Sequence, residues 1–163
     1  IIISTTLMDD LLKKLKANLA IGHNRYSTSG GSALDHAQPV INVENTFALA
    51  HNGNLPSVTA LQKFLASKKV LKENRSDSEL IADAIDFHMK EGDPLPEAVK
   101  KTFPLITGAF SIVMMTKDTL IATRDAFGMR PLALGKTGKG YVIASETCAI
   151  KTIAAKFVRE IKP

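Results

Sequence analysis

Residues 108–123 read GAFSIVMMTKDTLIAT and set the pattern for the second half of the chain. Apolar, β-branched runs over 109–116 and 119–123 are separated by Asp118, a residue type that favours turns. The stretch therefore predicts two strands joined by a short connection. The same reading predicts further strands over 131–134, 141–144 and 157–161, with turns at Gly128 and Gly138.

The residues before Gly108 follow helical rather than strand spacing. Val58, Leu61 and Leu65 recur at intervals typical of a helix that ends near Ser67. Residues 76–79, Ser-Asp-Ser-Glu, have the form of a capping box that begins a longer helix. We also expect helices over 9–18, 96–103 and 146–154, and strands over 19–23 and 47–51. Helices segregated from a strand meander predict an antiparallel α+β fold.

The composition is that of an ordinary globular domain. The 163 residues are 45% hydrophobic and 23% charged, which fits one domain over 1–163 with a real core. No apolar stretch approaches a bilayer span, and the start has no signal-peptide pattern. A single cysteine excludes an internal disulfide framework and predicts a cytoplasmic protein. The net charge of +5 comes mainly from scattered lysines, so neither nucleic acid nor membrane is an expected partner.

The first residues, Ile1-Ile2-Ile3-Ser4, contain no initiator Met and have the β-branched character of a strand entered midway. We interpret the chain as a partial domain, truncated at its N-terminal side. Inner strands without their neighbour would present an open edge, and self-association is one way to cover it. A homo-oligomer is therefore expected.

Arg25 is the first candidate binding residue. It follows an apolar run and precedes Tyr-Ser-Thr, so its guanidinium is expected at a strand end. There it could bind a substrate carboxylate through two parallel N–H bonds, with a further bond from Thr28. The alternative is a surface arginine that pairs with an acid of the protein itself.

Asn52 and Gly53 form a dipeptide with two interpretations. Asn-Gly is a strong hairpin signal, which predicts a tight turn after the strand at 47–51. The same geometry would let the Gly53 N–H and the Asn52 amide point at one spot. Two such donors make an oxyanion hole, and losing one typically costs roughly 100- to 1000-fold in rate.

Asp77 is placed in the first turn of the predicted helix. The helix dipole and the free N–H groups there keep a carboxylate ionised, as binding of a ligand ammonium requires. The structural alternative is an acid that only stabilises the helix start. A cation, a glycine amide and a carboxylate are together the groups needed to hold a zwitterionic amino acid.

The remaining reactive side chains fit structural roles. The four histidines lack metal-ligand spacing, and His23 and His51 are expected to make supporting hydrogen bonds in the core. Cys148 is expected on the apolar side of a short helix, as a small hydrophobe. Residues 135–140, Gly-Lys-Thr-Gly-Lys-Gly, lack the Walker spacing and are predicted to be a hairpin loop.

Several ordered blocks resemble the class II, N-terminal-nucleophile glutamine amidotransferases. They begin with GHNRYSTSG (22–30), AQP (37–39), ALAHNGNL (48–55) and RSDSE (75–79). They continue with GAFSIV (108–113), ATRDAFGMRPLALG (122–135), ASETCAI (144–150) and VREIKP (158–163). Tyr-Ser-Thr at 26–28 and the Arg-Asp-Gly block favour the branch whose glutaminase domain is joined to a phosphoribosyltransferase domain.

The resemblance implies an Ntn-hydrolase-like four-layer αββα sandwich of two antiparallel sheets. It implies that Arg25 and Thr28 hold the glutamine α-carboxylate and Asp77 its α-ammonium. Asn52 and Gly53 would form the oxyanion hole. The family nucleophile is an N-terminal cysteine with its own amine as base; Ile1 stands first here and Cys148 matches a different position, so the chain alone is expected to show no turnover.

The implied function is glutamine hydrolysis that supplies ammonia for phosphoribosylamine formation in purine biosynthesis. No cofactor or metal is implied for these residues, and magnesium would belong to the phosphoribosyltransferase domain. Two alternatives stay open: a class II amidotransferase with another acceptor, and a regulatory or scaffold protein that binds glutamine without cleaving it.

Overall fold

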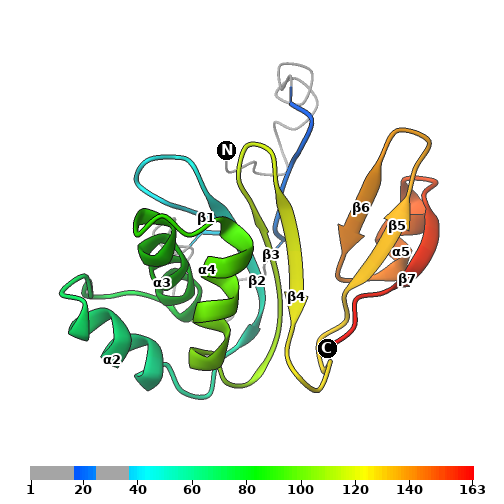
Figure 1. Ribbon diagram of the computed structural model, residues 1–163. Helices are drawn as coiled ribbons and strands as arrows, with labels where there is room; N and C mark the ends of the chain where they lie inside the picture. The colour runs from blue at the N-terminus through cyan, green and yellow to red at the C-terminus, as the bar shows by residue number, and fades with distance from the viewer. Residues whose placement is uncertain (1–16, 25–36) are drawn as a thin grey trace.

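The computed structural model describes residues 17–24 and 37–163, and two antiparallel sheets organise them (Figure 1). Sheet A has the order β1-β2-β3-β4 and sheet B the order β6-β5-β7. The strands of sheet A are β1 (Val40–Ile41), β2 (Ala48–Asn54), β3 (Ala109–Met115) and β4 (Leu120–Arg124). Those of sheet B are β5 (Ala133–Lys136), β6 (Tyr141–Ala144) and β7 (Lys156–Glu160).

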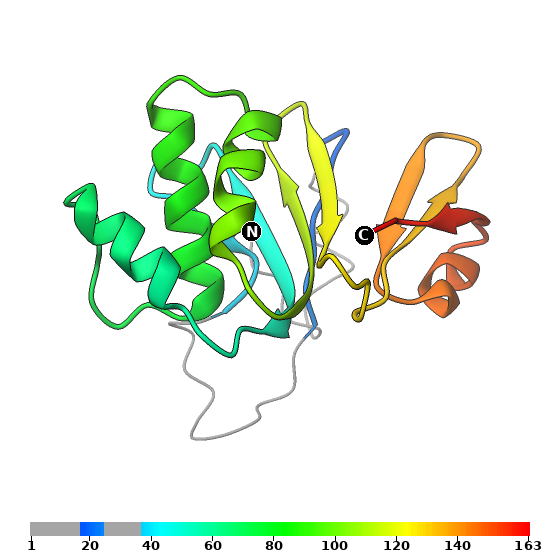
Figure 2. The same cartoon turned by 60° about the horizontal axis from the view of Figure 1, so that its bottom comes forward.

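The helices lie on the outer sides of the two sheets. One group covers a single face of sheet A, as Figure 2 shows: α2 (Thr59–Ser67), α3 (Asp77–Lys90), α4 (Leu95–Thr102) and the short 3-10 helix η2 (Phe103–Leu105). The helix α5 (Thr147–Thr152) packs on sheet B. The layers in space are therefore the first helix group, sheet A, sheet B and α5. This confirms the expected α+β architecture of two antiparallel sheets.

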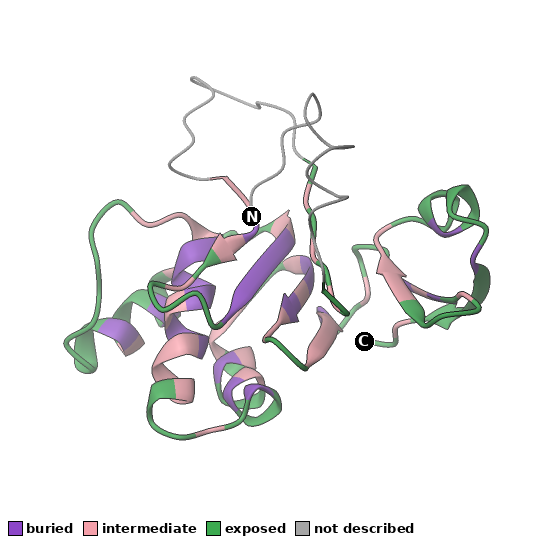
Figure 3. Cartoon of the chain, turned by 90° about the horizontal axis from the view of Figure 1, so that it is seen from above, coloured by how far each residue is buried: buried purple, intermediate pink, exposed green. Residues whose placement is uncertain are grey.

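The main hydrophobic core lies between sheet A and its helices (Figure 3). It is built from alternate residues of the strands and from the inner faces of the helices. Its largest fully buried side chains include Phe47, Leu49, Leu61, Leu65, Leu80, Ile81, Ile85, Phe110, Ile112 and Met114. Sheet B has a much smaller core of Ala133, Ile150 and Ala155. Sheet A and its helices are therefore the stable frame on which the site is built.

The connection from β4 to β5 ties the two sheets together. Asp125 is buried and its carboxylate accepts backbone N–H bonds from Phe110, Phe127 and Met129. Burial alone would raise the pKa of Asp125, but these N–H donors outweigh it and lower the pKa. Arg124 donates to the carbonyl oxygens of Gly128 and, at 2.8 Å, Ile161. This tight turn fixes where the chain leaves sheet A.

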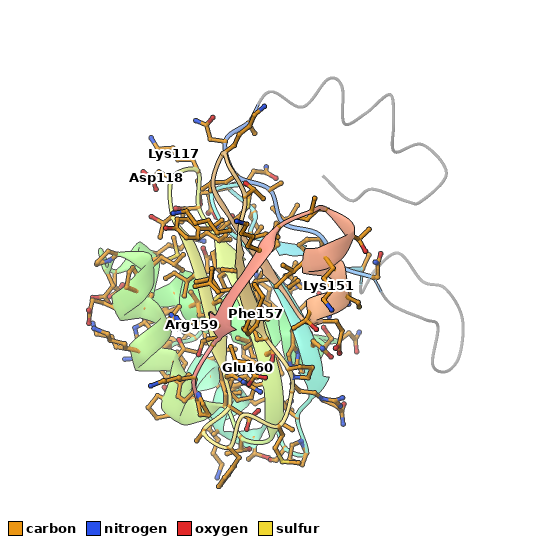
Figure 4. The ribbon with its side chains drawn as sticks, turned by 90° about the vertical axis from the view of Figure 1, so that its right-hand side faces the viewer. Lys117, Asp118, Lys151, Phe157, Arg159 and Glu160 are labelled. Atoms are coloured by element: carbon orange, nitrogen blue, oxygen red, sulfur yellow. The ribbon has the colours of Figure 1, made fainter. Side chains whose placement is uncertain are left out.

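The outer strand of sheet B remains exposed. Figure 4, seen from the sheet B side, shows β7 with Phe157, Arg159 and Glu160 crossing in front of the larger sheet. The side chain of Phe157 is 52% exposed. No helix in the described ranges is long and apolar enough to cross a membrane.

Three sequence predictions differ from the structure. Residues 19–23 form no strand. Asn52 and Gly53 are not a hairpin turn: β2 continues through Asn54, since long-range pairing with β3 outweighs the local turn preference. The two-residue strand β1 was missed because it is too short to show a period. The predicted helix over 9–18 lies almost entirely outside the described residues.

Cys148 is also placed differently from the prediction. It is exposed, not on the apolar side of α5. This short helix buries only Ile150 against sheet B. A residue two positions earlier is about 200° away around a helix and therefore faces solvent.

Candidate active site

The backbone of β2 alternates between two directions near its C-terminal end. Gly53 pairs with Phe110 in the register with β3. Both backbone polar groups of Phe110 bond to Asp125. The Phe110 N–H donates to the Asp125 carboxylate, and the Phe110 C=O accepts from the Asp125 N–H. Because the backbone groups of Phe110 face β4, Phe110 and Gly53 form a non-hydrogen-bonded pair of the antiparallel ladder. The Gly53 N–H and C=O therefore point away from β3.

Two neighbours of Gly53 confirm this direction. The N–H of His51 donates to Gln38 Oε1 at 2.6 Å, and the N–H of Leu55 donates to Asp77 Oδ2 at 3.2 Å. Strand β1 pairs only with Ala48 and Leu49, so it does not extend along this edge. Among the described residues, no strand pairs with this stretch of the β2 edge, and the Gly53 N–H lies there between two N–H groups that side chains satisfy.

Gly53 is required at this position by close packing. A Cβ atom built on it would lie 2.6 Å from the carbonyl oxygen of Ala109 and 2.6 Å from His51 Nε2. It would also lie 3.0 Å from the Cα atom of Phe110. Backbone and a buried ring both close in here, so only glycine fits.

Asp77 begins α3 next to that edge. Ser76 caps the helix by accepting from the Glu79 N–H, and the Glu79 carboxylate bonds back to the Ser76 N–H at 2.8 Å. The predicted capping box is therefore present, and Asp77 is free of that role. Its carboxylate accepts from the Leu55 N–H and from the Ser78 N–H at 2.7 Å, and its side chain is 23% exposed.

Asn52 points to the other side of sheet A. Side chains alternate along a strand, so Asn52 lies opposite to His51, on the face turned toward sheet B. It lines a cavity of about 50 Å³ together with Gly22 and His23 of the N-terminal stretch and Ser111 of β3. Its amide makes no side-chain hydrogen bond within the described part of the chain, which leaves its N–H₂ group available.

His51 is buried on the helix side of β2, with a side chain 1% exposed. Its Nδ1 lies 3.0 Å from Ser78 Oγ and 3.8 Å from Asp77 Oδ2. Burial is the largest cause of a lowered pKa; the Asp77 carboxylate opposes it, and the charges of His23 and Arg130 add to it. The ring is therefore neutral at physiological pH. The prediction of a supporting hydrogen-bond role is confirmed for His51.

The structure brings together two of the residues predicted from sequence. Asp77 and Gly53 lie at one edge of β2, and Asn52 is adjacent in sequence but faces the inter-sheet cavity. Arg25 and Thr28 lie outside the described residues. Sequence reasoning missed Gln38 and Ser78 as members of the site. The one available signal was their polarity beside apolar strand and helix residues.

Cys148 cannot serve this site. It lies on α5 at the outer side of sheet B, whereas Gly53 and Asp77 lie at the edge of sheet A (Figure 1). It is the chain's single cysteine.

Comparison with known proteins identifies the family of this chain. The family model described as "Glutamine amidotransferase domain" matches residues 23–152. The amidophosphoribosyltransferase of Drosophila melanogaster is 37% identical, and that of Bacillus subtilis 35% identical, over 99% of this chain. The chain covers 33% and 34% of these relatives, so it spans about a third of their length.

Solved structures give the same result. The glutamine phosphoribosylpyrophosphate (PRPP) amidotransferase from B. subtilis, complexed with ADP and GMP, matches with a TM-score of 0.72 and 34% identity. A structure described as the allosteric regulatory enzyme of purine biosynthesis matches with a TM-score of 0.75 and 36% identity. Each match covers 86% of this chain and 30% of the solved one. The chain belongs to the glutamine amidotransferase domain family.

Proposed function

We propose that this domain binds L-glutamine and forms the glutaminase part of an amidophosphoribosyltransferase. The main support is the open Gly53 N–H on the β2 edge. It lies two residues from Leu55, whose N–H donates to the Asp77 carboxylate. The Gly53 N–H can bind the side-chain end of an amino acid while the Asp77 carboxylate binds its α-ammonium. The family match and the relatives' names support the same reading.

In this proposal Asp77 binds the α-ammonium of glutamine. An ionised carboxylate can accept about four hydrogen bonds. Asp77 accepts from the Leu55 N–H, the Ser78 N–H and the Ser78 hydroxyl, which leaves capacity for the ligand. Arg25 and Thr28 bind the α-carboxylate, as the resemblance implies.

As the resemblance implies, the Gly53 N–H and the Asn52 amide would stabilise the oxyanion, the first from the β2 edge and the second from the side of β2 that faces the inter-sheet cavity. The attacking thiolate would be supplied by the family's N-terminal cysteine, whose own amine takes the thiol proton; the C–S bond forms as the carbonyl π electrons move to the oxygen. When the tetrahedral intermediate collapses, its nitrogen takes that proton back, the C–N bond breaks, and ammonia leaves to give the thioester. Water then attacks the thioester, and glutamate departs as the thiolate is restored. Both steps place negative charge at the same donors.

Whole-protein activity extends the proposal beyond this domain. Ammonia would pass to phosphoribosyl pyrophosphate in the phosphoribosyltransferase part, giving phosphoribosylamine in the cytoplasm. Magnesium would be held by that part. Because Cys148 is remote from Gly53, we expect the chain as given to bind glutamine without hydrolysing it.

Isothermal titration calorimetry with L-glutamine tests the proposal. Asp77→Asn removes the charge but keeps the shape, so affinity should fall roughly 10- to 100-fold, as expected for a charge-assisted bond. Asp118→Asn, in the β3–β4 turn, is the matched control and should bind like the unsubstituted chain. Equal affinity of the Asp77→Asn and Asp118→Asn variants would refute the proposed role of Asp77.

A further inference from the structure

The side chains of Gln38, His51 and Ser78, here called the polar triangle, form a closed set of contacts beneath the site. Gln38 Oε1 accepts from the His51 N–H at 2.6 Å, and Gln38 Nε2 donates to Ser78 Oγ at 3.1 Å. Ser78 Oγ lies 3.0 Å from His51 Nδ1. The triangle links the segment before β1, the strand β2 and the start of α3.

Hydrogen-bond counting gives one consistent set of directions, in which the Ser78 proton goes to Asp77 and not to His51 Nδ1. The Gln38 amide must present its oxygen to the His51 N–H, so its nitrogen donates to Ser78. The Ser78 hydroxyl has one proton and gives it to Asp77 Oδ1 at 3.2 Å. A hydroxyl that accepts from Gln38 and donates to Asp77 has one lone pair left. His51 Nδ1 therefore carries its proton and donates to Ser78.

His51 Nε2 then holds a bare lone pair. This atom is buried and has no hydrogen-bond partner. It lies against Gly53, since a Cβ atom there would come within 2.6 Å of it. A buried, unpaired nitrogen costs free energy, so its presence here calls for an explanation.

We propose that Gln38, His51 and Ser78 are positioning residues that hold the Gly53 N–H and the Asp77 carboxylate in the geometry that binds glutamine. The inference rests on the proposed function for its ligand. The triangle touches both groups: the His51 ring packs on Gly53, and the Ser78 hydroxyl bonds Asp77. It fixes the distance between the donor for the side-chain amide and the acceptor for the α-ammonium.

Two substitutions at His51 separate positioning from plain stabilisation. His51→Leu fills the space with apolar atoms and removes the unpaired nitrogen, so the fold keeps its stability or gains some. His51→Asn keeps a donor near the Nδ1 position but leaves a cavity, so the fold loses stability. We expect the reverse order for glutamine: about 10-fold weaker binding for His51→Leu, and affinity within about 3-fold of the unsubstituted chain for His51→Asn.

Ser78→Ala should also weaken binding about 10-fold, because it removes one of the three bonds that hold the Asp77 carboxylate. Thr102→Val is the matched control: it removes another buried hydroxyl, one that bonds only the Ala98 carbonyl within α4. Affinities that rank with stability across all four variants would overturn the proposal.

Amide hydrogen exchange at Leu55 supplies a readout without ligand. This N–H is protected by the Asp77 carboxylate. Exchange at Leu55 should accelerate in Ser78→Ala and His51→Leu and stay unchanged in Thr102→Val. Unchanged exchange in Ser78→Ala and His51→Leu would overturn the positioning role. Failure of the unsubstituted chain to bind glutamine, with accelerated exchange in those variants, would count against the proposed function while supporting the triangle.

Discussion

Gly53 occupies a point in β2 where three neighbours leave no room for a side chain. Sequence reasoning selected this residue for its freedom in turns, yet its backbone is an ordinary strand. The requirement comes instead from the approach of Ala109, Phe110 and His51. Because Gly53 has no Cβ, the His51 ring packs against the Gly53 backbone, whose N–H points to the β2 edge.

Gly53→Ala should therefore destabilise the fold by about 1–3 kcal/mol, the usual cost of forcing an atom into a packed site. Gly138→Ala is the control, because nothing lies within 4 Å of a Cβ at that position. It should change stability by less than about 0.5 kcal/mol. Urea denaturation followed by circular dichroism measures both. Equal stability of the two variants would show that β2 and β3 do not meet as described.

The buried His51 ring makes stability depend on pH. Its pKa is lowered from 6.5, chiefly by burial, so between the two values the unfolded chain binds the proton and the folded chain does not. The free energy of unfolding should therefore decrease as pH falls below about 6.5. The lowered pKa of His88, also due first to burial, acts in the same direction.

Urea denaturation at about pH 8 and about pH 5.5 measures this effect. The loss of stability on acidification should be smaller in His51→Asn, because one of the two rings with a lowered pKa is removed. The same loss in both proteins would mean that His51 is protonated as easily in the fold as in the unfolded chain.

At the scale of elements, α3 shows how local sequence determines a site residue. The capping box over 76–79 was readable from the residue types alone, and the structure contains both of its reciprocal bonds. Ser76 and Glu79 make the hydrogen bonds that cap the start of α3. The Asp77 carboxylate is therefore available to accept from the Leu55 N–H. A helix that began one residue later would turn Asp77 away from β2.

Ser76→Ala should lower the free energy of unfolding by about 1 kcal/mol, the usual value of an N-cap. Ser76→Thr keeps the accepting hydroxyl and should recover most of the loss. Thermal and urea denaturation of the two variants give the comparison. A Ser76→Ala protein as stable as Ser76→Thr would indicate that packing alone fixes the start of α3.

The element that sequence reasoning could not place is the end of β2. Asn-Gly favours a turn locally, but pairing of Asn52 with Ser111 and of Gly53 with Phe110 extends the strand. Such pairs join residues more than fifty positions apart, and no local pattern contains them. The polar triangle was missed for the same reason, since Gln38, His51 and Ser78 meet only in the folded chain.

At the scale of the whole molecule, Arg124 connects the two sheets. Its side chain is 7% exposed, at the end of β4, and donates to Gly128 and to Ile161, which follows β7. Glu160 Oε2 lies 3.5 Å from its Nη1. Periodicity predicted most of the strands and helices, but this link between distant segments was not predictable.

Arg124→Met keeps the apolar stem and removes the donors, which should cost roughly 2–3 kcal/mol because charge-assisted bonds to two carbonyls are lost. Arg159→Met, on exposed β7, removes a bond only to the adjacent Glu160 carbonyl and serves as control. Urea denaturation gives the stability, and amide exchange in β5 and β7 locates the change. Faster exchange restricted to sheet A would contradict the proposed link.

The β2 edge at Gly53 and the start of α3 at Asp77 together form the proposed glutamine site. Titration of the ¹⁵N-labelled chain with L-glutamine tests it directly through the Gly53 amide resonance, with Gly138 and Gly140 in the β5–β6 loop as internal controls. We expect a saturable shift at Gly53 that Asp77→Asn weakens, and none at the two loop glycines. A Gly53 resonance that stays unchanged while glutamine saturates other resonances would contradict it.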